Sequence, residues 1–436
     1  MLSNFAISDS QPNAQRTVRK KVGGLHQAVL LVAVVMYSSA SFAQSAANIS
    51  NSDKELIQAL LRRVEQLESR VTQLEASNHQ PATQPAMVPQ GPPPAVVAPE
   101  PAPEQMVEPQ RMDAKTLLQI RGFGDMTFHG SDMKGSTNSF SLGQLNLFVT
   151  SDISEKFRLL SEIVFEGDDN NVFGVDVERL LLQYSHNDYF NLSVGRYHTD
   201  IGFYNTAYHH SAWLQTAVGR PFLFLFEDQG GILPVHNVGF SLTGLVPSGR
   251  LGLHYVAEVG NGRASRLGAE AVQSVVDENN GKAINLALFA RPNAVRGLQV
   301  GFSAYHDTLR PFPASPQIGE NIFAAHAVLQ RPAFEWLNEA MVIRHSVQNA
   351  HVFATPAFYT QISKAFGKYR PYFRYQYLNS SDAEPIFPSV GLQYGPSLGV
   401  RFDPTEAVAL KLQYDHGSFR HQTPVNSAEL QFAFTF

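Results

Sequence analysis

The chain has 436 residues, no cysteine, and a formal net charge of −5 from 33 basic and 38 acidic side chains. The lack of cysteine excludes disulfide frameworks, thiol nucleophiles and cysteine-based zinc sites, and the acidic balance argues against a nucleic-acid-binding protein. Charged residues make up 16% of the chain and aromatic residues 11%. Beyond the N-terminal region no stretch approaches the roughly 20 apolar residues that a membrane-spanning helix needs, which excludes a helical membrane protein.

Residues 1–43 have the layout of an export signal peptide. Basic residues at positions 16, 19, 20 and 21 precede an apolar run over residues 28–37. Small residues then lead to a signal-peptidase motif, so cleavage is expected between Ala43 and Gln44. An uncleaved anchor is the alternative, but the apolar run is too short to cross a bilayer. The protein is therefore expected to be exported.

Residues 51–77 carry the repeat of a left-handed coiled coil. Apolar residues alternate in steps of three and four, and they form the predicted core: Ile57, Leu60, Val64, Leu67, Val71 and Leu74. Arg63 and Arg70 occupy g positions, and Glu68 and Glu75 occupy the following e positions, a pairing typical of parallel assembly. We expect parallel self-association, with two and three strands both open. A lone amphipathic helix is the alternative.

A proline-rich linker follows over residues 78–115. Ten prolines lie between residues 79 and 109, mixed with alanine, glutamine and glutamate. Such a segment cannot bury a core and should be an extended polyproline spacer.

From residue 116 to residue 436 the apolar pattern changes to period two. In the last segment Leu430, Phe432, Phe434 and Phe436 alternate with polar or small residues, as a strand between lipid and a wet lumen requires. The pattern predicts an all-β fold, a transmembrane antiparallel β-barrel of about sixteen strands. The expected strands are 117–129, 139–151, 156–167, 175–185, 189–198, 236–247, 250–261, 282–291, 297–308, 321–331, 334–346, 351–366, 368–378, 391–403, 406–416 and 426–436.

The predicted connections alternate between short turns and mostly longer loops. Turn residues such as those at 247–249 and 403–405 mark the short set. The longer set includes 199–235, 262–281, 309–320, 379–390 and 417–425. This asymmetry is expected of a barrel with one rim in the periplasm and the other outside the cell. With an even strand number, the start of the first strand and the end of the last strand both lie on the short-turn side, where the linker would emerge.

The last ten residues resemble the C-terminal signal by which bacterial outer-membrane proteins are recognised for insertion. The layout as a whole resembles the outer-membrane porins of the phosphate-selective O and P group, here with an N-terminal coiled coil. This resemblance implies a homotrimer in the outer membrane of a Gram-negative bacterium, with the coiled coil in the periplasm. It implies passive diffusion of small hydrophilic or charged solutes or ions through a water-filled channel, with membrane lipid as a partner and no cofactor, metal, nucleic acid or enzymatic activity. Phosphate selectivity is not expected, because the barrel segment holds 23 basic and 28 acidic side chains.

A barrel of this size is too wide for side chains to fill, so its inner residues should line water. The strand parity predicts these pore-lining residues: Arg121, Arg158, Glu162, Glu166, Arg179, Arg370, Arg374, Arg401 and Lys411. Charged walls of this kind select ions, although the same residues could merely solvate the wall. The parity also places Arg196 on the apolar face of its strand, so a bulge or a shifted register is expected there.

The third long loop, residues 199–235, is rich in aromatic residues. The resemblance implies that it folds into the lumen as a constriction, with its charges Arg220, Glu227 and Asp228 near the narrowest point. Packing against a neighbouring subunit is the alternative.

Other functions have weaker signals in the sequence. His209 and His210, with His198 and His236, could form a metal cluster, but no carboxylate has the helical spacing of a ligand. The sequence shows no G-x-S-x-G elbow, because its one match to that pattern, residues 395–399, falls inside a predicted strand and not at a strand-to-helix turn, so a serine hydrolase is not expected. The main alternative to a channel is a structural protein that tethers the outer membrane to the cell wall, with peptidoglycan as the partner of the coiled coil.

Overall fold

The structure, a computed structural model, describes residues 117–167, 171–208, 211–263, 275–277, 279–311 and 315–436. The predicted signal peptide with its cleavage site, the coiled coil with its core and the proline-rich linker lie outside the described residues. None of the helices in the described ranges combines the length and the apolar character that a membrane span requires.

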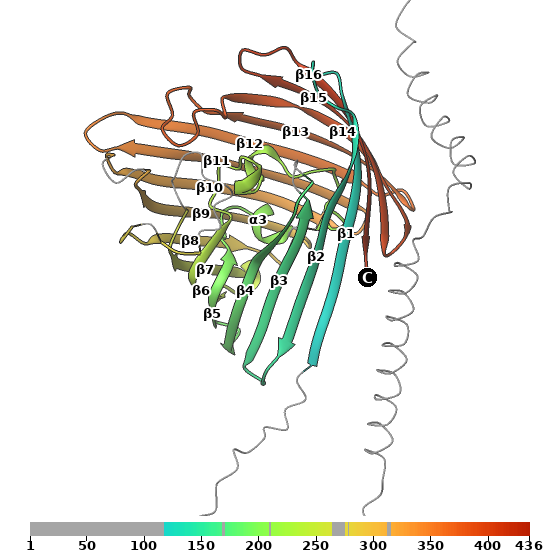
Figure 1. The fold of residues 1–436 in the computed structure, drawn as a ribbon. Helices are drawn as coiled ribbons and strands as arrows, with labels where there is room; N and C mark the ends of the chain where they lie inside the picture. The colour runs from blue at the N-terminus through green and yellow to red at the C-terminus, as the bar shows by residue number, and fades with distance from the viewer. Residues whose placement is uncertain (1–116, 168–170, 209–210, 264–274, 278, 312–314) are drawn as a thin grey trace, which may run out of the picture. The chain divides into compact units, whose positions relative to one another are not determined.

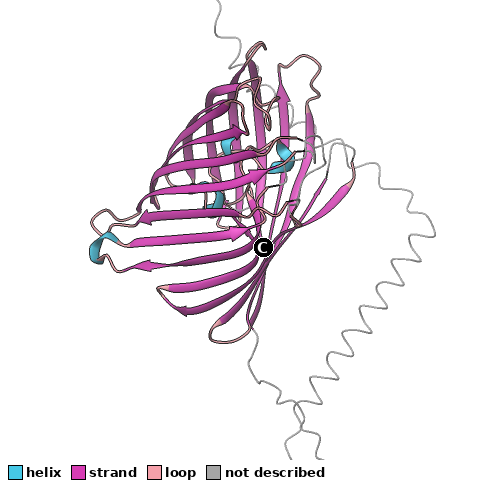
Figure 2. Cartoon of the chain, turned by 90° about the vertical axis from the view of Figure 1, so that its left-hand side faces the viewer, coloured by secondary structure: helices cyan, strands magenta, loops and turns pink. Residues whose placement is uncertain are grey.

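The described residues form a closed antiparallel barrel of sixteen strands, in which each strand pairs with its neighbours in the sequence and β1 pairs with β16 (Figures 1 and 2). The strands are β1 (Leu117–Ser131), β2 (Ser139–Asp152), β3 (Phe157–Gly167), β4 (Phe173–Asn187), β5 (Phe190–His198), β6 (His236–Val246), β7 (Leu253–Gly260), β8 (Ala283–Ala290), β9 (Leu298–Leu309), β10 (Ile318–Arg331), β11 (Phe334–Val347), β12 (Val352–Lys364), β13 (Tyr369–Asn379), β14 (Leu392–Thr405), β15 (Val408–Phe419) and β16 (Val425–Thr435). The predicted fold class and strand count are confirmed.

Alternation along the strands separates an apolar outer face from a polar inner face. On β16, the outward Phe434 is 43% exposed, whereas the inward Gln431 and Ala433 are buried. The seam of the barrel is closed by the last residue, because the backbone groups of Phe436 and Gly122 exchange two hydrogen bonds of 2.9 Å. An apolar outer band around a polar interior is the arrangement that a barrel in lipid requires.

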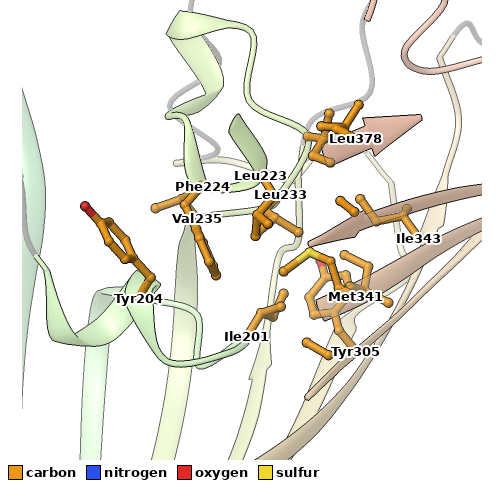
Figure 3. Packing of buried hydrophobic residues seen from close by; sticks show 14 of the residues in the cluster. Ile201, Tyr204, Leu223, Phe224, Leu233, Val235, Tyr305, Met341, Ile343 and Leu378 are labelled. Carbon is orange, nitrogen blue, oxygen red and sulfur yellow. The ribbon is translucent and has the colours of Figure 1, made fainter. Parts of the chain in front are cut away.

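The loop between β5 and β6 is folded inside the ring of strands. Its described residues form three short helical turns, α3 (Tyr204–Ala207), η2 (Phe222–Phe224) and η3 (Glu227–Gln229), and α3 lies within the barrel in Figure 1. The main hydrophobic core forms between this loop and inward residues of the wall. In Figure 3, Leu223, Phe224 and Leu233 of the loop lie toward Met341 and Ile343 of β11. The loop is thus part of the packed interior.

Two backbone irregularities explain the expected mismatch at Arg196. The register of β3 and β4 shifts so that Glu178 is an extra residue, and both Glu178 and Arg179 are buried on the inner side. Opposite this bulge, Gly195 of β5 has a φ of +131°, a conformation that glycine adopts readily. The backbone can therefore turn Arg196 inward, where it lies 3.7 Å from the Glu178 carboxylate.

Candidate functional site

In the loop at residues 199–235, the start of α3 is attached to the barrel wall through β11. Glu339 accepts hydrogen bonds from the backbone N–H of Phe203 at 2.5 Å and of Tyr204 at 3.0 Å, and from the Tyr359 hydroxyl at 2.7 Å. These N–H groups stand at the start of α3, where a helix leaves its first donors without an internal partner. One buried carboxylate therefore fixes the first turn of the loop.

Three predicted pore-lining cations hold the middle of the same loop. Arg374 donates to the carbonyl oxygen of Gly219 at 3.1 and 3.2 Å, and Arg401 donates to those of Trp213 and Gln215 at 2.7 and 3.0 Å. Lys411 donates to the carbonyl oxygens of residues 212 and 217. Arg374 and Lys411 are each only 1% exposed. These cations lie inside the barrel, but between the wall and the loop.

Within the loop, Arg220 is buried against aromatic rings. Its guanidinium lies 4.0 Å from the ring centroid of Phe226 and 5.2 Å from that of Tyr204, and it donates to the carbonyl oxygens of Phe224 and Tyr208. Burial lowers the pKa of Arg220 to about 10, so it is still charged at neutral pH. Its cation–π contacts and carbonyl partners stabilise the fold of the loop.

Glu227 fastens the end of the loop to the start of β6. Its carboxylate accepts from the His236 backbone N–H at 3.0 Å and lies 3.1 Å from the His236 ring. Burial alone would raise the pKa of Glu227, but the charge and hydrogen bonds of His236 outweigh it, and the pKa lies below its ordinary value of 4.5. The His236 ring also contacts Glu178 at 2.8 Å. Asp228 belongs to η3, and its side chain lies outside the described part of the structure.

Most of the other predicted residues lie on the wall formed by β1 to β4, and Arg370 lies on β13. Arg179 donates to Glu162 at 2.6 Å and lies over the Phe148 ring, and both charged groups are buried. Arg121 is on the same face as Phe148, is exposed, and is near the short-turn end of the barrel. The remaining predicted residues are bound to neighbours: Glu166 to Gln144, Arg158 to Asp152 at the rim, and Arg370 to Ser363 and the carbonyl oxygen of Pro332.

The lumen keeps open space on both sides of the loop. Toward the long-loop end, a cavity of about 290 Å³ is lined by Arg220 and Phe222 of the loop and by Gln376, Asp415 and Glu429 of the wall. Toward the short-turn end, a cavity of about 550 Å³ lies against β4 to β8. Charged and polar groups line both spaces, so both suit water and hydrophilic solutes.

A second in-folded loop was not anticipated from the sequence. Residues 380–391, between β13 and β14, place Glu384, Ile386 and Phe387 in the interior. Glu384 contacts His345, whose other ring nitrogen lies 2.9 Å from Glu320. The Phe387 ring packs on His345 at 5.2 Å. The signal for this loop in the sequence was the adjacent pair Ile386 and Phe387, because large apolar residues in a loop need a buried partner.

Among the described residues, no group of three or more histidine or acidic side chains is arranged to hold a metal ion. His198 and His236 lie next to each other, with ring centroids 4.8 Å apart, but His198 contacts the carbonyl oxygen of Asn205 and His236 lies between two glutamates. His209 and His210 lie outside the described residues.

No model of a known protein family and no curated protein sequence matches the chain. Solved structures do match its fold. The anion-selective porin from Comamonas acidovorans is 10% identical with a TM-score of 0.53, and the match covers 74% of this chain and 100% of that one. OmpF of Salmonella typhi, in complex with daunomycin, is 10% identical with a TM-score of 0.53 over 73% of this chain and 97% of that one. The outer-membrane channel DcaP of Acinetobacter baumannii is 10% identical with a TM-score of 0.52 over 74% and 98%. The barrel has a porin-type fold.

Proposed function

We propose that the protein is an outer-membrane porin, a water-filled channel through which small hydrophilic or charged solutes diffuse down their gradients. The observation that supports this most directly is the loop at residues 199–235. Polar wall residues hold it inside a closed sixteen-stranded barrel, with open space lined by polar groups on either side. A barrel of this width needs such a constriction to discriminate between solutes.

The location and assembly belong to the same proposal. An apolar outer face supports insertion into the outer membrane of a Gram-negative bacterium, after export directed by residues 1–43. The short-turn end, where both β1 begins and β16 ends, would face the periplasm. The linker and the coiled coil at residues 51–77 would then lie in the periplasm and join the chains of a homotrimer. The comparison includes a trimer form of OmpT, an outer-membrane protein of Vibrio cholerae, at 11% identity and a TM-score of 0.51.

The ion preference is proposed from the charges of the lumen. Arg374 and Lys411 bind neutral acceptors within the described residues, so their positive charge is not neutralised by direct ion pairs. Arg121 adds an exposed positive charge on the inner face. Across the barrel from them, on β7, stands the carboxyl group of Glu258. Such a division of charge would set a transverse field across the solute path.

The test is conductance in a planar lipid bilayer. Purified protein, shown to be folded by its β-sheet circular dichroism, should produce stepwise ion conductance, in groups of three steps for a trimer. Removal of residues 51–76 should weaken the assembly but leave conductance of single channels. Silence from folded protein would overturn the channel and favour the tethering alternative, which gains no support from the described residues.

A further inference from the structure

The cavity at the short-turn end of the lumen has an acidic lining. Asp188, Asp200 and Glu258 contribute carboxylates to the space of about 550 Å³, and Arg179 contributes a guanidinium that is already paired with Glu162. The lining also holds two histidines, His198 and His254. With their carboxyl groups ionised, the three acidic residues favour a positively charged occupant.

Glu258 and Asp200 form the inner end of this cavity, and their carboxylates differ in hydrogen bonding. Glu258 accepts from the Ser241 hydroxyl at 3.2 Å, the Asn285 amide at 2.8 Å and the Asp200 backbone N–H at 3.1 Å. Among the described residues, the Asp200 carboxylate has no hydrogen bond and no ion pair. Burial raises the pKa of Asp200 to about 7. A cation beside it would favour its charged form.

Two further oxygens at the same place lack a donor. The hydroxyl of Tyr197, a residue that lines the cavity and is 3% exposed, has no hydrogen-bond partner within the described residues. The same is true of the amide oxygen of Asn285, which is 1% exposed and whose nitrogen binds Glu258. Buried polar atoms are nearly always paired, so unpaired acceptors next to a carboxylate point to a missing donor. An alkylammonium group offers three N–H donors and no acceptor.

The shape of the lining favours an organic cation over a metal ion. A bound Ca²⁺ would need about six to eight oxygen ligands, and the inner end offers two carboxylates in a space much larger than one ion. The rings of Tyr197 and Tyr255 also line the cavity, and aromatic faces attract ammonium groups. Arg291 is a nearby cation, but it donates to Gln299 at 2.8 Å and makes no ion pair with Asp200.

We propose that this cavity, with Asp200 and Glu258 at its inner end, is a binding site for small organic solutes that carry a protonated primary amine. The inference rests on the proposed channel and narrows its solute class. Asp200 is the second residue of the in-folded loop, so a solute bound here would lie next to the constriction.

The test uses putrescine, a short diamine, on the purified full-length protein. Added on the short-turn side of a planar bilayer, putrescine should reduce the conductance in a saturable way. Asp200→Asn should raise the half-saturating concentration at least tenfold, and Glu258→Gln should do the same. Glu406→Gln, which alters an exposed carboxylate at a short turn, should leave it unchanged. The matched uncharged probe is 1,4-butanediol, which should have no saturable effect.

Calorimetric titration of putrescine into detergent-solubilised protein tests the site without conductance. Heat of binding that disappears in Asp200→Asn supports the site, even if the protein forms no channel. A conducting protein that neither binds putrescine nor is blocked by it would overturn the amine site and leave the porin proposal standing. Equal block by 1,4-butanediol, or equal block of Asp200→Asn and the parent protein, would overturn the site as well.

Discussion

The ammonium group of Lys411 on β15 donates a hydrogen bond of 3.1 Å to the carbonyl oxygen of Ala217 in the loop. The two residues are 194 positions apart, and their contact is one of a series. Cations of β13 to β15 bind carbonyl oxygens in the middle of the loop, and Glu339 of β11 binds backbone N–H groups at its start. The barrel wall thus offers donors where the loop presents acceptors, and acceptors where it presents donors.

Loss of the Lys411 ammonium should loosen the loop. Lys411→Met keeps the length of the side chain but leaves the carbonyls of residues 212 and 217 and the Gln431 amide oxygen without this donor. A hydrogen bond to a charged group contributes roughly 1.5 to 3 kcal/mol, so the attachment should weaken while the barrel itself persists. We expect noisier and larger single-channel currents, and faster cleavage of the loop by chymotrypsin at Trp213.

The control for this variant is Lys156→Met at the exposed turn between β2 and β3, which should leave both readouts unchanged. Quiet currents and an uncut loop in Lys411→Met would show that the loop does not depend on this contact.

Charge reversal at Arg121 should shift ion selectivity without disturbing the loop. Arg121 is exposed on the inner face, and its side chain makes no contact with the described loop residues. In Arg121→Glu the cation-to-anion permeability ratio should rise by roughly two- to fivefold, because a solvated charge acts with about 0.5 to 1 kcal/mol at close range. The measurement is the reversal potential across a salt gradient.

Arg158→Glu supplies the comparison, since Arg158 is at the rim and already paired with Asp152. Its smaller effect on the reversal potential would agree with screening by bulk salt. If Arg121→Glu left the potential unchanged, the solute path would not pass this residue.

The strands could be predicted well because their signals are local. Alternation and turn residues placed each strand end within three residues of its observed position, the start of β7 at Leu253 and the end of β15 at Phe419 being among the largest differences. The bulge at Glu178 also had a local signal. Val175 and Val177 face outward, as do Leu180 and Leu182, so the outward spacing lengthens by one residue where two charged residues stand side by side.

The loop contacts could not be predicted because they join residues far apart in the chain. Phe203 and Glu339 are 136 positions apart, and strand parity says only that Glu339 points inward. The sequence could place Arg374 on the inner face, but only the folded loop shows that its guanidinium binds Gly219. The hydrogen bond from the Asp200 backbone N–H to Glu258 could not be predicted for the same reason, because it depends on the path of the loop after β5.

Acid should release the end of the loop through Glu227. The pKa of this carboxyl lies below 4.5 because His236 stabilises its charged form against the effect of burial. A lowered pKa contributes stability at pH values above 4.5, and this contribution is lost as the pH falls through the folded-state value. Single-channel noise should therefore increase below pH 4.5 in the parent protein. Glu227→Gln should show that noise already at pH 7, and a parent profile in the variant would contradict this role.

Asp200→Asn should stabilise the protein at alkaline pH. Burial raises the pKa of Asp200 from 3.8 to about 7, so the folded state holds a proton that the unfolded state has released between these two values. Stability must then fall as the pH rises through this window, and the loss is complete above pH 7. Asparagine keeps the shape and carries no charge, so Asp200→Asn should unfold at a higher temperature than the parent at pH 8, with little difference at pH 4.

The midpoint of thermal unfolding by circular dichroism in detergent measures this difference, with Glu406→Gln as the control. A variant that is less stable than the parent at pH 8 would mean that the ionised Asp200 is already compensated in the folded barrel. Higher stability together with lost putrescine binding would instead identify a carboxylate held for a ligand at the expense of the fold.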